Sequence, residues 1–84
     1  MNHQPHQQDY LRIQDLALAA VLNLSIPLDS IERINPRDNK VTFVFADSSH
    51  IDELVDQFWK RQLTVEPLAY FNSLKFIKSR IHER

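Results

Sequence analysis

The segment after Lys40 constrains the fold most, because a strand pattern in it is followed by two helical patterns. Large and smaller side chains alternate from Val41 to Ala46 with the period of two typical of a strand. Apolar residues then recur at helical spacing from Ile51 to Trp59, which predicts an amphipathic helix. A last helix is predicted from Pro67 to about His82, because proline suits the first helical turn and Glu66 suits the N-terminal end. Each signal is explained by folding, and none requires catalytic chemistry.

The first half predicts a buried helix between two strands. Alternation from Tyr10 to Gln14 predicts a short strand, and Asp15 is suited to cap the helix that follows. The run from Leu16 to Leu24 is apolar except for Asn23, so we expect this helix to lie centrally, between the sheet and another helix or a partner chain.

The next two strands are predicted to form a hairpin. Leu28 to Ile34 has its apolar residues three apart, so a strand here needs a bulge. It is followed by a turn over Asn35 to Asn39 and by the strand at Val41 to Ala46. With an optional edge strand at Leu63 to Val65, the order is β-α-β-β-α-(β)-α. We therefore predict a single α+β domain over residues 10–84, with helices on one face of a small antiparallel or mixed sheet, after a disordered tail at residues 1–9.

The composition excludes several kinds of site. The chain has no cysteine, which excludes disulfides and thiolate zinc sites. It also has no glycine, which argues against P-loops and dinucleotide fingerprints and assigns left-handed turn positions to Asn, Asp or Ser. The N-terminus lacks the apolar core of a signal peptide, and the longest apolar run, Leu16 to Leu22, is too short to span a bilayer. We predict a cytoplasmic protein that uses no cofactor and no metal.

A family resemblance adds to this interpretation. The motif residues are Asp15, Phe43, Phe45, Trp59, Pro67, Phe71, Leu74 and Lys75. Over roughly Tyr10 to Arg80 the chain resembles a family of short bacterial and phage-associated proteins classified only as a domain of unknown function. The family's pattern has glycine near Ser25, where this chain departs from it. The resemblance implies no activity, and the family's association with mobile elements hints at a role with nucleic acids.

Three groups of residues have both a structural and a functional interpretation. Asp47 to His50 contains triad residue types, but their consecutive placement favours helix capping. Asp52, Glu53 and Asp56 are interpreted as a solvated helix face, with a site for a divalent ion or a patch for a basic partner as the alternatives. The aromatic residues are assigned to the core, with a base-stacking platform on the strand as the alternative. They are Phe43, Phe45, Phe58, Trp59, Tyr70 and Phe71.

The last helix and the charge distribution lead to two functional hypotheses. Its inward stripe is predicted to contain Tyr70, Phe71, Leu74, Ile77 and Ile81. Four acids without a base occupy residues 46–57, whereas residues 58–84 hold six bases and two acids. We predict a non-enzymatic interaction module, either self-associating or a subunit of a larger assembly. The alternative is a nucleic-acid-binding accessory protein that uses Arg33, Arg37, Lys40, Lys75, Lys78, Arg80 and Arg84.

Overall fold

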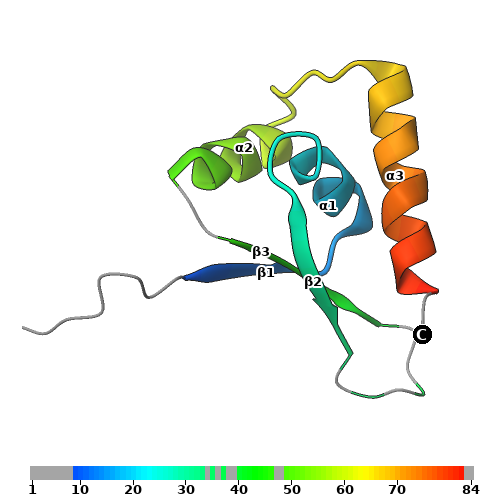
Figure 1. Cartoon of the computed structure of the whole chain (residues 1–84). Helices are drawn as coiled ribbons and strands as arrows, with labels where there is room; N and C mark the ends of the chain where they lie inside the picture. Colours follow the sequence, from blue (N-terminus) through cyan, green and yellow to red (C-terminus); the bar gives the residue numbers. More distant parts are fainter. Residues whose placement is uncertain (1–8, 34, 36, 38–39, 47–48, 83–84) are drawn as a thin grey trace, which may run out of the picture.

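The computed structural model describes residues 9–33, 35, 37, 40–46 and 49–82. Along the chain it has a strand, a helix, two strands and two helices, and it confirms the predicted α+β class (Figure 1). The elements are β1 (Tyr10–Ile13), α1 (Leu16–Leu22), β2 (Leu28–Glu32), β3 (Thr42–Ala46), α2 (Ser49–Trp59) and α3 (Pro67–Ile81). Residues 63–65, where an edge strand was an option, form no strand.

The sheet is antiparallel, with β3 in its centre and the order β1-β3-β2. β2 and β3 form the predicted hairpin, and a register shift between Leu28 and Ser30 confirms the bulge. The chain crosses from β1 to β2 through α1, so β3 later fills the space between two strands that run in parallel. The expected tail at residues 1–9, apart from Asp9, and most of the turn at residues 35–39 lie outside the described residues.

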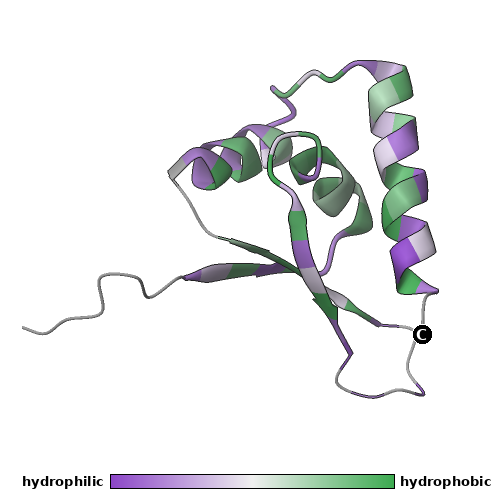
Figure 2. Ribbon diagram, viewed as in Figure 1, coloured by the Kyte–Doolittle hydropathy of each residue, from purple (hydrophilic) through white to green (hydrophobic). Residues whose placement is uncertain are grey.

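The core lies between one face of this sheet and the helices. Phe43 and Phe45 are completely buried, which excludes them as a platform for stacking bases. α1 contacts both α2 and α3, and all three helices lie on the same side of the sheet (Figure 1). Figure 2 shows α1 as almost wholly hydrophobic, in keeping with its predicted central position. The buried core cluster consists of Ile13, Leu18, Ala19, Leu22, Phe43, Phe45, Ile51 and Ile77.

On the opposite face of the sheet, an ion pair connects the two outer strands. Arg12 on β1 reaches Glu32 on β2, with Nε 3.2 Å from a carboxylate oxygen. This hydrogen bond and the charge of Glu32 raise the pKa of Arg12. Because β3 lies between these strands, the Arg12 side chain must pass over Val44, its register partner, which is only 2% exposed.

Local capping positions the helices where the sequence predicts them. Asp15 accepts from the Leu18 amide at 2.8 Å and begins α1. Glu66 accepts from the amides of Leu68 and Ala69 and begins α3, and these bonds lower the pKa of Glu66. α2 already begins at Ser49, so the capping position before it falls on a residue outside the described ones.

The end of α2 differs from the prediction for left-handed positions. Arg61 has a φ of 61°, so a long side chain takes the position that we assigned to Asn, Asp or Ser. The amide of Gln62 donates a hydrogen bond to the Gln57 carbonyl, and the amide of Arg61 donates one to the Phe58 carbonyl. This pair of hydrogen bonds is a Schellman motif, whose left-handed residue is usually glycine. The chain has no glycine, so Arg61 occupies this position, and the two backbone hydrogen bonds of the motif hold it in the left-handed conformation.

None of the helices within the described residues is both long and apolar enough to cross a membrane.

Candidate interaction surfaces

One stripe of α3 points away from the core and combines apolar with basic side chains. We define the α3 outer face as Leu68, Phe71, Lys75 and Lys78, which follow one another at spacings of three and four residues. Leu68 is 63% exposed and Phe71 is 52% exposed. The Lys75 ammonium lies 5.0 Å from the centre of the Phe71 ring, a cation–π contact. The prediction that Phe71 belongs to the inward stripe is therefore wrong.

A buried serine explains the rotation of α3. Ser73 is 7% exposed, and its Oγ donates to the Ala20 carbonyl at 2.7 Å and accepts from Asn23 Nδ2 at 3.0 Å. Asn23 Oδ1 also accepts from the Leu28 amide, which ties the end of α1 to the start of β2. A small side chain at position 73 lets α3 approach α1 closely and places Ile77 in the core. The opposite side of α3, with Phe71, consequently faces outward.

The outward side of α2 is acidic and ends in an exposed aromatic ring. We define the α2 outer face as Asp52, Asp56 and Trp59, again at spacings of four and three. Trp59 is 61% exposed, so its assignment to the core is wrong. Its ring packs edge to face against Phe58 at 5.0 Å between centroids and 85° between planes, which fixes its position at the surface. Phe58 itself packs against the core as predicted.

The acidic side chains of α2 form surface ion pairs. Asp56 lies 3.0 Å from the Lys60 ammonium, and Glu53 lies 3.9 Å from Nδ1 of His50. Among the residues that the structure describes, no three potential metal ligands come together. The solvated-face interpretation fits these contacts. The hydrolytic residue types at positions 47–50 lie partly outside the described residues.

The structure brings together two basic segments that are distant in the sequence. Arg33, just after β2, donates from Nη2 to the Ile81 carbonyl at the end of α3. Lys40, just before β3, lines a pocket with the same Ile81. A cation at a helix C-terminus is favoured by the helix dipole. We call this region the basic corner and define it by Arg33, Lys40 and the last turn of α3, which carries Lys78 and Arg80.

The remaining predicted bases lie at different places. Arg37 is in the hairpin connection, where its amide bonds Asn35 Oδ1 at 3.0 Å. Lys75 lies farther along α3, over Phe71. Arg80 is half-buried, with its guanidinium 5.8 Å from the centre of the Phe76 ring. Arg84 lies outside the described residues.

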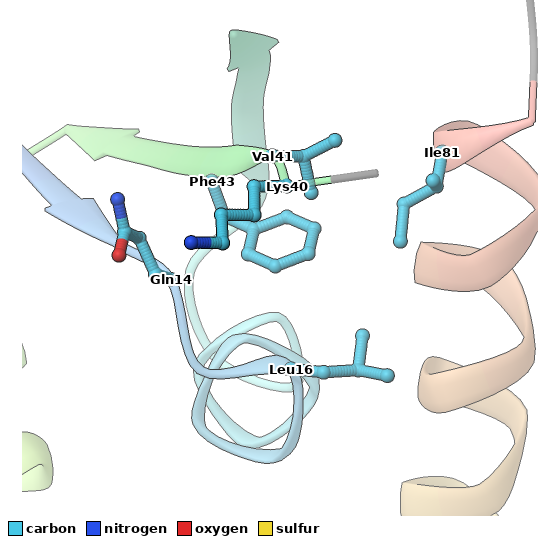
Figure 3. A pocket seen from close by; sticks show the side chains of 6 residues that line it. All are labelled: Gln14, Leu16, Lys40, Val41, Phe43 and Ile81. Atoms are coloured by element: carbon cyan, nitrogen blue, oxygen red, sulfur yellow. The ribbon is translucent and has the colours of Figure 1, made fainter. Parts of the chain in front are cut away.

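The pocket beside the basic corner has an apolar floor. Leu16, Phe43 and Ile81 point into a shared space of about 380 Å³, with Gln14 and Lys40 at its edge (Figure 3). This volume is near the lower end for small-molecule sites. Its lining offers apolar contact, one amide and one ammonium group, and among the described lining residues Lys40 is of a type that can serve as a nucleophile or general base. No local sequence pattern predicts this pocket, because its walls come from the start of α1, the start of β3 and the end of α3.

Comparison with known proteins places the chain in a family without assigning it an activity. No curated protein and no solved structure matches it. The profile of one protein family matches residues 8–83, almost the whole chain, and confirms the resemblance to proteins of unknown function. The chain belongs to the family described as domain of unknown function DUF5659.

Proposed function

We propose that this chain is a non-catalytic interaction module that binds another protein chain through the α3 outer face. The observation that carries the proposal is the pair Leu68 and Phe71, both more than half exposed on one stripe of a helix. Single exposed apolar residues are ordinary, but an aromatic ring beside a leucine and two lysines on one stripe is not a typical solvated face. Aromatic residues are enriched at protein interfaces.

The packing of α3 against the rest of the protein also supports a role for α3 as a rigid binding helix. Ile77 is fully buried and Ser73 is hydrogen-bonded to α1, so the outer face is held in position before any partner arrives. A preordered face loses less conformational entropy on binding than a mobile one. The anchors Leu68 and Phe71, followed by Lys75, have the i, i+3, i+7 spacing by which amphipathic helices enter a partner's groove.

Site-specific photo-crosslinking tests this proposal. A photoreactive phenylalanine analogue would replace Phe71 in the full chain, and the same analogue would replace Asp29, an exposed residue of β2, as a control. Irradiation in the native cells is expected to give an adduct of defined mass from position 71 and none from position 29. Absence of an adduct at position 71, with the variant folded by circular dichroism, would contradict the proposal.

The basic corner favours nucleic-acid binding as a second candidate function. The contact between Arg33 and the Ile81 carbonyl joins bases of the hairpin to bases of α3 that lie more than 40 residues later in the sequence. Lysine and arginine side chains gathered in this way can neutralise neighbouring phosphates, with an affinity that falls steeply as salt rises.

The second candidate has its own experiment. Lys40→Glu with Lys78→Glu reverses two bases of the basic corner, and Lys60→Glu with Arg61→Glu reverses two bases at the end of α2 as a control. If the corner binds nucleic acid, the first variant loses affinity for a mixed oligonucleotide pool and the control retains it. Affinity that does not change with salt would rule out this candidate.

A further inference from the structure

The α2 and α3 outer faces are complementary in both charge and apolar character. The α2 face carries two acids followed by an exposed tryptophan, and the α3 face carries two apolar residues followed by two lysines. Both faces are on helices that flank α1 (Figure 1), and the residues of both faces are exposed. A single chain therefore presents an acidic stripe and a basic stripe, each with an exposed aromatic ring at one end.

The spacing along the two helices matches when they run antiparallel. Asp56 and Asp52 lie three and seven residues before Trp59, or about 4.5 and 10.5 Å along the axis. Lys75 and Lys78 lie four and seven residues after Phe71, or about 6 and 10.5 Å. With Trp59 opposite Phe71, Asp56 thus meets Lys75 and Asp52 meets Lys78. Parallel helices with Trp59 opposite Phe71 would instead leave Lys75 and Lys78 beyond the end of α2, with no aspartate opposite them.

We propose that the occupant of the α3 outer face is the α2 outer face of a second copy of this chain. This rests on the proposed function and names its partner. Trp59 of one copy packs on Leu68 and Phe71 of the next, and the two aspartates pair with the two lysines. The present contacts of Asp56 with Lys60 and of Lys75 with the Phe71 ring are exposed and are exchanged at little loss.

The contact is heterologous, because two different faces meet. After two copies pair, one copy keeps a free α2 face and the other keeps a free α3 face, so the assembly grows until it closes into a ring or continues as a chain. The two helix stripes bury a small area, so we expect association that depends on protein concentration. Trp59 is the only tryptophan, so its emission reports burial at this contact directly.

Charge reversal of each face tests the pairing. Asp52→Lys with Asp56→Lys makes both faces basic, whereas Lys75→Glu with Lys78→Glu makes both acidic. Each double variant is expected to associate roughly tenfold more weakly than the wild type, because two attractive pairs become repulsive. Glu53→Lys with Asp29→Lys makes the same change in net charge as Asp52→Lys with Asp56→Lys, on exposed residues outside both faces, and is expected to keep wild-type association.

Restoration makes the test specific. A chain with all four reversals, and an equimolar mixture of the two double variants, are both expected to recover association and the blue shift of Trp59 emission. Light scattering coupled to gel filtration gives the mass across a concentration series. A wild type that stays monomeric, or a fourfold variant that does not recover, overturns the proposal. If the crosslink from position 71 joins a different protein and not a second copy, this inference fails and the proposed function stands.

Discussion

Ser73 Oγ donates a hydrogen bond of 2.7 Å to the carbonyl oxygen of Ala20, 53 residues earlier in the chain. Ala20 lies near the end of α1, where carbonyls lose their helical partners, and the amide of Leu24 bonds Val21 instead. The serine hydroxyl therefore satisfies a buried carbonyl and fixes how α3 is rotated against α1. This contact decides that Phe71 faces outward.

Replacing Ser73 by Ala is expected to lower the free energy of unfolding by about 1–3 kcal/mol. The change leaves the Ala20 carbonyl and the Asn23 amide without their partner in a buried position. Urea unfolding followed by circular dichroism measures the effect. Ser79→Ala is the matched control, because Ser79 makes a similar bond to the Phe76 carbonyl at the surface, and its effect is expected within about 0.5 kcal/mol. Equal effects at both positions would contradict this account.

Replacing Arg61 by Gly is expected to raise the free energy of unfolding by about 0.5–1 kcal/mol. The left-handed conformation strains any residue with a Cβ, and glycine relieves that strain at some loss of backbone entropy. Arg61→Ala keeps the Cβ and removes the charge, so it is expected to give no gain in urea unfolding. A gain of the same size from alanine would assign the effect to charge.

The sequence predicted those features that depend on neighbouring residues. Asp15 and Glu66 cap their helices because a cap needs only the amides of the next turn. The bulge in β2 follows from apolar spacing within a single strand. The prediction that Phe71 and Trp59 face the core was wrong, because apolar character alone does not determine which side of a helix packs against the core. For Phe71 that choice rests on the hydrogen bond of Ser73 to Ala20, a contact between distant segments that local sequence patterns do not predict.

Arg12 is the register partner of Val44 and pairs with Glu32 across β3, so we predict a larger loss of stability from Arg12→Ala than from Arg12→Met. Methionine keeps an apolar stem above Val44 and loses only the ion pair with Glu32, which is exposed and contributes little. Urea unfolding at low and high salt separates the two contributions. Equal losses from both variants, with a strong dependence on salt, would show that the ion pair matters more than the stem.

The charge of Glu66 is expected to make stability depend on pH in the acid range. Amide hydrogen bonds from Leu68 and Ala69 lower the pKa of Glu66 in the folded protein. The contribution of the Glu66 charge to stability is therefore complete above the usual glutamate pKa of about 4.3, and it is lost as the pH falls through the lower pKa of the folded state.

Glu66→Gln should be less stable than the wild type at neutral pH, and this difference should shrink as the pH falls below the usual glutamate range. Urea unfolding at several pH values measures it. Glu53→Gln removes an exposed acid from the middle of α2 and is the control for the loss of one surface charge. A gap between Glu66→Gln and the wild type that stays constant down to low pH would contradict a role for the ionised carboxylate in starting α3.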